Sequence, residues 1–340
     1  MSSDSECSRD SGKAMVEKDP KYSDENTPVT SSTGHVFNLV QVLGAGAFGR
    51  VYKAKRAGDD KKRFAVKLEL NNQHNSSADE IAAMAAVSGR RQFCQLVEHG
   101  TTVDGTHTII VMSLLSETVE ERLKHYTARK GTFSLETALR IGDQTLKAIR
   151  SLQEAGFLSL DIKPSNFAFG RHDGLESDKV VYMIDFGLSK RFRNQNGDRL
   201  PRGVATTLRL TPSYASRNAM ATSNVSPRDD MESWFYMLLR LTTGALPWRV
   251  EGVEPEFMDI WNKKFQMAMD PRKRAEFLAG CPKVYKKIYV QICTTPAYLD
   301  PDYEKLGKRL RQAAKAKKID LDRSGWKWEW FAEHIHSNYE

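Results

Sequence analysis

The sequence predicts an α+β protein in which a small β-rich unit precedes a larger helical unit. Up to about residue 115, apolar residues alternate with polar ones, as they do in half-buried strands. Beyond that point, apolar residues recur at the spacing of a helix, and capping residues precede them. The chain has 340 residues, of which 40% are hydrophobic and 9% aromatic, and this suffices for one large domain or two ordinary ones.

The first residues differ in composition from the rest of the chain. They are rich in Ser, Asp, Glu and Lys and contain few large apolar side chains. Such a segment cannot bury enough apolar surface to offset the entropy lost on ordering. We therefore expect a disordered tail over 1–34, a folded domain over 35–331 with its lobes at about 35–115 and 116–331, and a C-terminal tail over 332–340.

Three segments of the first part have the pattern of strands. A strand that runs into a glycine cluster is predicted by Phe37, Leu39, Val40 and Val42. A half-buried strand is predicted by the alternating residues Phe64, Val66 and Leu68. Residues 107–115 are the third predicted strand. Residues 79–88 are the one helix candidate in this part of the sequence.

Two helices of the second part have clear start signals. Ser134 is a capping residue and Gly156 lies just past the helix end; the apolar face comprises Leu135, Leu139, Leu146, Ile149 and Leu152. At Ser226-Pro227 a capping residue is followed by proline at the first helical position. The stretch DDMESWFYMLLRL that follows is apolar almost all round, which predicts a helix at the centre of the domain.

The C-terminal part contains a basic segment and three alternating tryptophans. The simpler interpretation of residues 304–318 is a helix face exposed to solvent. The alternative is a docking surface for acidic partners. Trp326, Trp328 and Trp330 are expected to seal the C-terminal edge of the domain rather than to bind a ligand.

The net charge of +8 favours acidic peptides, phosphate groups or acidic protein surfaces as partners. The sequence contains no basic platform interleaved with aromatic residues and no helix-turn-helix signal, so we expect no nucleic-acid partner. There is no apolar run of membrane-spanning length, so we expect no membrane association.

The four cysteines, Cys7, Cys94, Cys281 and Cys293, form no CxxC pair and have no accompanying histidine cluster. Free thiols in a reducing compartment are the expected state. Together with the absence of a signal-peptide apolar region, this predicts an intracellular protein of the cytoplasm or nucleus.

The stretch LGAGAFGRV at 43–51 has the spacing of a phosphate-binding glycine loop. Gly44, Gly46 and Gly49 alone are weak indicators, because dinucleotide-binding folds share the pattern. Here Val51 follows, and VYKAK continues as a strand rather than as a helix. This favours a hairpin that covers nucleotide phosphates, where glycines let backbone amides approach without an intervening Cβ.

Lys67 ends an apolar alternation, FAVK, where a buried ammonium group needs a partner. Glu80 on the helix that follows is the preferred candidate, and Asp79 is the neighbouring alternative. Such a pair would hold Lys67 against the α- and β-phosphates of ATP.

Three polar residues recur at a spacing that suits phosphoryl transfer. Asp161 and Asn166 are five residues apart, and Asp185 opens a DFG sequence 24 residues after Asp161. Asp161 suits the orientation and deprotonation of an attacking hydroxyl, whereas Asn166 and Asp185 offer the oxygen ligands that Mg²⁺ prefers. Lys163 would neutralise charge on the transferred group. The apolar run VVYMI predicts a buried strand that delivers Asp185.

Together these motifs resemble the casein kinase I superfamily of eukaryotic protein kinases, and most closely its tau-tubulin kinase-like branch. The resemblance runs from about 36 to 331 and rests on DIKPSNFAFGR, IDFGLSKRF, YASRNA, RDDMESWFYMLL, GALPWR and PDYEKL. YASRNA stands where most other kinases have Ala-Pro-Glu, which is a specific mark of this superfamily. The resemblance implies the bilobal protein kinase fold, with a small β-rich N-lobe and a larger helical C-lobe.

The resemblance also implies serine/threonine phosphorylation of protein substrates, acidic ones among them, by a monomer that uses ATP and Mg²⁺. Met112 falls at the gatekeeper position, and Ser113 to Leu115 fall at the hinge that would bind adenine. The residues expected at the nucleotide are Leu43, Gly44, Ala45, Gly46, Ala47, Phe48, Gly49, Val51, Ala65, Lys67, Glu80, Met112 and Leu115. Asp161 and Lys163 are the catalytic residues, and Asn166 and Asp185 the metal ligands.

The chain departs from the family pattern in the catalytic loop. Ser159 and Leu160 stand in place of His-Arg, and Leu210 and Ser213 in place of Gly and Arg. Leu160 cannot contact a phosphate on the activation loop, so we expect activity without activation-loop phosphorylation. Thr211 matches a family threonine that lies close to the catalytic Asp and Lys.

The departures leave three functional interpretations. None of the departures removes a group that touches the reacting phosphate, which favours an active kinase. One alternative is a nucleotide-binding pseudokinase that acts as a scaffold. The other is a kinase of very low activity, in which a loosened catalytic loop misplaces Asp161.

Overall fold

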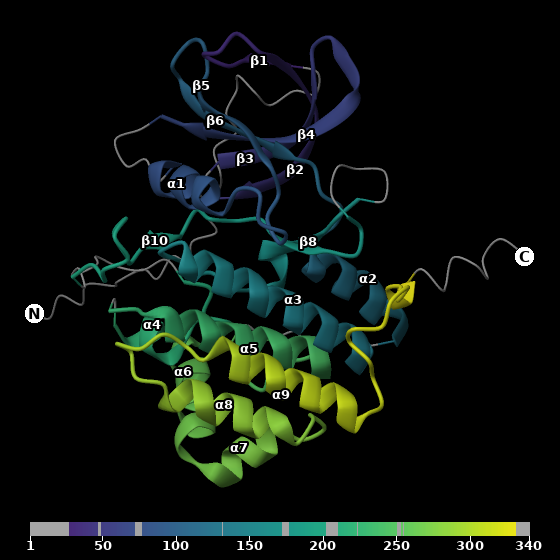
Figure 1. Ribbon diagram of the computed structural model, residues 1–340, viewed down its shortest axis with the longest axis vertical. Helices are drawn as coiled ribbons and strands as arrows, with labels where there is room; N and C mark the ends of the chain where they lie inside the picture. Colours follow the sequence, from purple (N-terminus) through teal and green to yellow (C-terminus); the bar gives the residue numbers. More distant parts are fainter. Residues whose placement is uncertain are drawn as a thin grey trace, which may run out of the picture. The chain divides into compact units, whose positions relative to one another are not determined.

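The computed structural model describes residues 27–46, 49–71, 77–130, 132–171, 177–201, 210–222, 224–249, 253 and 255–330; for residues 60 and 126–130 it describes the backbone alone. The chain divides into two compact units (Figure 1). We call the first, Met1–Asn75 with Val97–Met112, the β unit, and the second, Ser76–Leu96 with Ser113–Glu340, the helical unit.

The β unit is a six-stranded sheet with the order β1-β2-β3-β4-β6-β5. Its strands are β1 (Pro28–Thr30), β2 (Val36–Gly46), β3 (Gly49–Arg56), β4 (Asp59–Leu70), β5 (Leu96–Thr101) and β6 (His107–Ser113). β1 to β4 pair as successive antiparallel neighbours. The strands predicted around Phe37, Phe64 and 107–115 are therefore confirmed.

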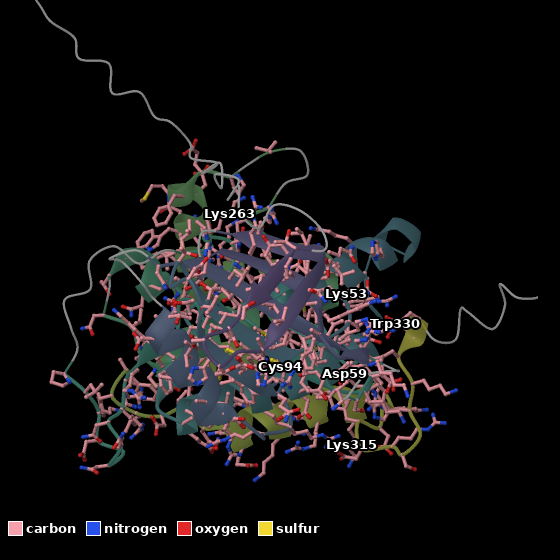
Figure 2. The ribbon with its side chains drawn as sticks, turned by 90° about the horizontal axis from the view of Figure 1, so that it is seen from above. Lys53, Asp59, Cys94, Lys263, Lys315 and Trp330 are labelled. Carbon is pink, nitrogen blue, oxygen red and sulfur yellow. The ribbon has the colours of Figure 1, made fainter. Side chains whose placement is uncertain are left out.

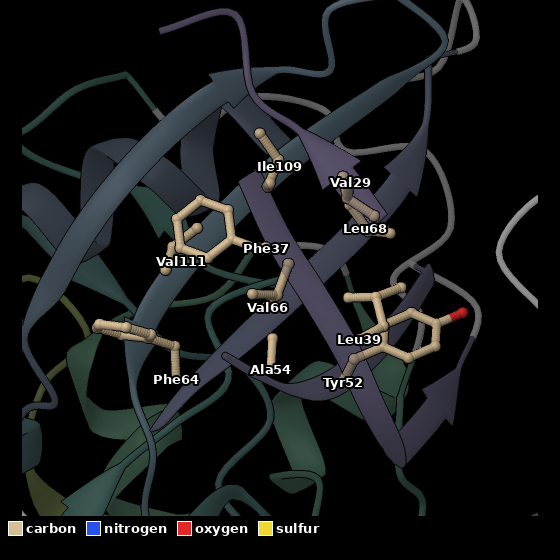
Figure 3. Close-up of a cluster of buried hydrophobic side chains, with 10 residues drawn as sticks. All are labelled: Val29, Phe37, Leu39, Tyr52, Ala54, Phe64, Val66, Leu68, Ile109 and Val111. Carbon is tan, nitrogen blue, oxygen red and sulfur yellow. The ribbon is translucent and has the colours of Figure 1, made fainter. Parts of the chain in front are cut away.

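The apolar residues of these strands form one core, drawn in Figure 3. Its members are Val29, Phe37, Leu39, Tyr52, Ala54, Phe64, Val66, Leu68, Ile109 and Val111. The rings of Phe37 and Phe64 meet edge to face with their centroids 6.0 Å apart. Alternate residues of β2, β3, β4 and β6 supply nine of these ten side chains, because the side chains of a strand point to opposite faces in turn.

The predicted disordered tail over 1–34 is wrong at its C-terminal end. Pro28–Thr30 form β1, which pairs with β2, and Val29 is fully buried opposite Phe37. A single buried valine and the backbone bonds to an existing strand are enough to order a segment of otherwise polar composition. Residues 1–26 lie outside the described residues.

The helical unit contains α1 (Ser77–Val87), α2 (Val119–Lys130), α3 (Leu135–Glu154), α4 (Arg217–Ala221), α5 (Pro227–Thr243), α6 (Phe257–Met269), α7 (Pro271–Phe277), α8 (Val284–Thr294) and α9 (Tyr303–Ala316). Two short antiparallel strand pairs, β7 (Phe157–Leu158) with β10 (Lys190–Arg191) and β8 (Phe167–Phe169) with β9 (Val181–Met183), follow α3. Strands and helices thus confirm the α+β prediction.

The start signals of α3 and α5 act as predicted. The Ser134 side chain accepts a hydrogen bond from the backbone N–H of Thr137. Ser226 and Asp229 form a capping box at the start of α5, with Pro227 at the first helical position. α5 packs against α3, α4 and α8 (Figure 1), and nearly all of its residues are buried.

The tryptophans close the C-terminal edge of the helical unit, as predicted. Trp328 and Trp330 are buried and stacked, with centroids 5.1 Å apart, and both contact Phe169 at the end of β8. Trp330, labelled in Figure 2, is the last described residue. The exposed side chain of Lys315 on α9, labelled in the same view, is a solvated residue of the basic segment.

Cys94, Cys281 and Cys293 are free thiols, as predicted, and Cys7 lies outside the described residues. Among the helices described, none combines the length and the hydropathy needed to cross a bilayer.

Candidate active site

The glycine loop of the β unit is a hairpin of β2 and β3. Gly46 pairs with Gly49, and the tip residues Ala47 and Phe48 lie outside the described residues. Gly49 has φ +116°, and a Cβ there would lie 2.1 Å from the carbonyl oxygen of Leu68. Only glycine fits at this position.

At the other two glycines the surroundings are open. A Cβ on Gly44 or Gly46 would meet no atom within 4 Å. Packing within the described residues therefore does not require glycine at these positions, whereas the close approach of a phosphate to the backbone would. Because a strand and not a helix follows the loop, the dinucleotide alternative does not apply.

The other residues of the β unit that were predicted at the nucleotide lie on β2, β3, β4 and β6. Ala65 and Met112 are buried, Val51 is half-buried, and Leu43 and Ala45 are exposed on β2. Lys67 lies opposite Val51 on β4 and is 8% exposed. Its Nζ forms an ion pair of 3.0 Å with Oε1 of Glu69, a partner that the sequence analysis did not identify.

The other two predicted residues belong to the helical unit. Glu80 is buried in the first turn of α1, whereas the alternative, Asp79, is exposed. A buried carboxylate needs a cationic partner and an exposed one does not. Burial therefore favours Glu80 over Asp79, and the pairing with Lys67 stays a prediction. Leu115 follows β6 and is half-buried.

The carboxylate of Asp161 is held on both oxygens. Thr211 Oγ1 donates to Oδ1 at 2.7 Å, and Asn166 Nδ2 donates to Oδ2 at 2.9 Å. Lys163 Nζ lies 2.6 Å from Oδ2 and also donates to Thr211 Oγ1 at 3.1 Å. This network fixes the carboxylate in one orientation and places a cation beside it, which suits the binding of a hydroxyl substrate and of a phosphate.

Asn166 and Asp185 emerge at the same end of the hairpin β8–β9. Asn166 immediately precedes β8, Asp185 follows β9, and Phe167 pairs with Met183. The backbone N–H of Ile184 donates to the carbonyl oxygen of Asn166 at 3.1 Å. The buried strand predicted before Asp185 is thus confirmed, and it brings the two predicted metal ligands together.

The donor atoms of these two residues fit Mg²⁺. Both hydrogen bonds from the Asn166 side chain use its nitrogen, and no bond within the described chain engages its oxygen. Asp185 accepts one bond at Oδ1, from the N–H of Gly187 at 2.9 Å. In the described part of the chain, no group of three or more His, Cys, Asp or Glu side chains is arranged so that it could hold a metal ion by itself. Mg²⁺ suits a site of this kind, because it is commonly held by one or two carboxylates together with phosphate oxygens.

Asp230 on α5 binds the backbone of the loop that carries Asp161, and the sequence analysis missed it. Its Oδ2 accepts a bond of 3.0 Å from the backbone N–H of Ser159, and its Oδ1 one of 2.9 Å from that of Leu160. Leu160 has φ +62°, a left-handed conformation that costs a residue other than glycine about 1–2 kcal/mol. The two bonds to Asp230 offset that strain next to Asp161.

Asp230 is fully enclosed. Gln153 Nε2 donates to Asp230 Oδ2 at 2.9 Å, and the hydroxyl of Tyr303 donates to Gln153 Oε1. Burial raises the pKa of Asp230 to about 6, against the lowering effect of its three hydrogen bonds. The signal that could have found this residue is a group of carboxylates at the start of a helix predicted to be buried, because such groups require donors or cations from elsewhere.

The segment after Asp185 is anchored by a strand pair and by hydrogen bonds to Asp300. β10 pairs with β7, the strand that leads into the catalytic loop. Asp300 accepts bonds from both Arg193 and Arg199, each at 2.6 Å. Residues 202–209 lie outside the described residues, and the chain becomes described again at Leu210, next to Thr211.

Comparison with known proteins agrees with this geometry. Residues 37–302 match the family model of the protein kinase domain. The chain is 30% identical over 292 residues to the serine/threonine-protein kinase spe-6 of Caenorhabditis elegans, which covers 85% of this chain and 75% of that protein. It is 32% identical over 219 residues to a probable casein kinase I homolog of Encephalitozoon cuniculi, covering 64% of this chain and 65% of that protein. A probable serine/threonine-protein kinase of Dictyostelium discoideum is 31% identical over 214 residues, 63% of this chain and 42% of that protein.

Proposed function

The chain belongs to the protein kinase family, and from this premise we propose that it is an active serine/threonine kinase. It transfers the γ-phosphate of ATP to serine and threonine hydroxyls of protein substrates. The names of the relatives described above support this choice of acceptor. Two of these relatives are named as serine/threonine-protein kinases and one as a probable casein kinase I homolog.

One observation carries the proposal of activity. The carboxylate of Asp161 is bound by Thr211, Asn166 and Lys163, although Ser159-Leu160 replace the family's His-Arg. The backbone of that dipeptide is in turn bound by Asp230. A scaffold that had lost its chemistry would have no need to orient this carboxylate, and the loop would be free to relax from the strained conformation of Leu160.

Each residue of this network has a role in the proposed transfer. Asp161 orients the substrate hydroxyl and accepts its proton, and Lys163 offsets the charge on the transferred group. Asn166 and Asp185 would hold Mg²⁺, which supplies charge neutralisation across the phosphates when it is bound. In the β unit the glycine hairpin and Lys67 bind the phosphates, and Ala65 and Met112 contact the nucleoside.

The finer assignments rest on the sequence motifs and the charge. We place the chain in the casein kinase I superfamily, near the tau-tubulin kinase-like branch, because of motifs such as YASRNA and RDDMESWFYMLL. The net charge of +8 supports acidic protein substrates. The free cysteines support a reducing compartment, the cytoplasm or the nucleus, and we propose a monomer that has neither a nucleic-acid nor a membrane partner.

A phosphotransfer assay tests this function. Purified full-length chain is incubated with γ-labelled ATP, Mg²⁺ and either casein or tubulin, and the labelled amino acids are identified. Label on serine and threonine, lost when the metal is chelated, is the expected result. Nucleotide binding without any transfer to either protein would favour the scaffold, and label on tyrosine would contradict the acceptor class.

A further inference from the structure

A buried lysine of α6 contacts the backbone next to the catalytic network. Lys264 Nζ donates to the carbonyl oxygens of Pro212 and Ala215, each at 2.6 Å. It also lies 4.6 Å from the ring centroid of Tyr236 and 4.9 Å from that of Trp248. Two carbonyl groups and two aromatic faces therefore surround one ammonium group.

The two carbonyls belong to a single tight turn that begins at Thr211. The backbone N–H groups of Tyr214 and Ala215 both donate to the carbonyl oxygen of Thr211 at 2.9 Å. Trp248 Nε1 adds a bond of 2.9 Å to the carbonyl oxygen of Ser213. Lys264 and Trp248 thus donate to three carbonyl groups of the turn. Thr211, the first residue of the turn, bonds to Asp161 through its side chain.

We propose that Lys264 is a positioning residue for phosphoryl transfer: it fixes the turn 211–215 so that the hydroxyl of Thr211 holds the carboxylate of Asp161. Its influence reaches the reaction through Thr211, and Lys264 itself touches no reacting atom. The inference rests on the proposed kinase activity, and it extends that activity to a residue 103 positions from the catalytic base in the sequence.

The ammonium group of Lys264 is costly to bury at this position. The Lys264 side chain is fully buried, and burial lowers its pKa to about 7, an effect that the Glu232 carboxylate opposes. In return, Lys264 donates to two carbonyl groups of the turn, and the loss of a donor to a buried carbonyl group is itself destabilising. A methionine would fill a similar space and leave the turn without these two bonds, so the lysine acts on the position of the turn.

This reasoning predicts that activity and stability respond differently to Lys264→Met. We expect kcat to fall about 10- to 100-fold, because small displacements of a catalytic group have effects of that size. The KM for ATP should change little, and the melting temperature should fall by only a few degrees, because two carbonyl groups lose their donor. Lys263→Met is the matched control, because the neighbouring lysine is half-exposed, lies at the surface (Figure 2) and should leave kcat unchanged.

Hydrogen–deuterium exchange provides a readout that does not depend on activity. In Lys264→Met the amides of Tyr214 and Ala215 should exchange faster than in the wild type, whereas those of α9 should not change. If Lys264→Met does not fold, Lys264→Gln serves instead, because its shorter side chain keeps a polar donor but cannot reproduce both bonds to Pro212 and Ala215.

The outcomes separate the two proposals. An unchanged kcat, or unchanged exchange at Tyr214 and Ala215, would overturn the role of Lys264 even in an active kinase. A loss of kcat that only follows a loss of folded protein would overturn it as well. If the wild type transfers no phosphate, the proposed function fails, and the exchange measurement still decides whether Lys264 positions the turn.

Discussion

The carboxylate of Asp230 binds the backbone N–H of Leu160 at 2.9 Å, although 70 residues separate the two in the sequence. Leu160 holds a left-handed conformation one residue before Asp161. The contact therefore joins the most buried helix of the helical unit to the strained point of the catalytic loop. Together with the bond to Ser159, it holds the backbone of the Ser159-Leu160 dipeptide in place.

Asp230→Asn should impair the loop more than the fold. An amide can present only one oxygen to the three donors, and its own N–H₂ group would face a backbone N–H. We expect a loss of stability of about 1–3 kcal/mol. Displacement of the neighbouring Asp161 should lower kcat by about 100-fold. Thermal unfolding and steady-state kinetics measure the two effects, with the exposed Asp259→Asn as the control. A normal kcat in Asp230→Asn would contradict the positioning role.

The rate should fall in mild acid because Asp230 must be ionised to accept all its bonds. Its pKa is about 6, so protonation as the pH falls through 6 replaces an acceptor with an O–H donor that faces backbone N–H groups. We expect kcat of the wild type to decrease between pH 7.5 and 5.5. The residual rate of Asp230→Asn should lack this decrease. A decrease of the same size in the variant would assign it to another group.

Protonation of Asp230 has opposite effects on rate and on stability. It lowers the rate, whereas proton uptake by the folded chain raises the free energy of unfolding. Its pKa in the folded chain lies above the ordinary value of 3.8, so the folded chain binds more protons than the unfolded chain between about pH 4 and 6. The free energy of unfolding of the wild type, relative to Asp230→Asn, should therefore fall as the pH rises to 6 and then stay constant. Denaturant titrations at several pH values measure this difference.

Thr211→Ala should slow the reaction through lost orientation of Asp161. The alanine removes the bond of 2.7 Å to the carboxylate and the acceptor for Lys163. We expect kcat to fall about tenfold or more at an unchanged KM for ATP. Thr211→Ser keeps the hydroxyl and should restore most of the rate. If serine is no better than alanine, the hydroxyl is not the group that matters.

Activity should not require a phosphate on the activation loop. Leu160 carries no charge, and Asp300 binds the preceding segment through Arg193 and Arg199. Phosphatase treatment should leave the rate unchanged, and Thr206→Ala with Thr207→Ala, both outside the described residues, should be nearly silent. Asp300→Asn should lower the rate. A large loss after phosphatase that an upstream kinase restores would contradict this prediction.

The parts of the fold with local signals could be predicted from the sequence. Ser134 and Ser226 start their helices because a short side chain that bonds to the next turn is a local device. Gly49 is required by its own φ angle and by the neighbouring strand. The order and spacing of Asp161, Asn166 and Asp185 likewise come from a loop and a hairpin that are close in the sequence.

The residues that could not be predicted act over long sequence distances. Asp230 and Lys264 lie in helices, and their partners lie 70 and about 50 residues away, so no periodicity reports on them. Lys264 stands beside Lys263 in a polar stretch and has the pattern of a surface residue, although it is fully buried. β1 was missed because its order depends on an existing strand edge rather than on its own composition.

The rate of γ-phosphoryl transfer by Asp161→Asn, relative to the wild type at saturating ATP and Mg²⁺, tests the central claim most directly. The amide keeps the size of the side chain and removes the proton acceptor, so nucleotide binding should persist while transfer falls to the background rate. Equal transfer by the two proteins would contradict the claim that the Ser159-Leu160 loop presents a working catalytic carboxylate.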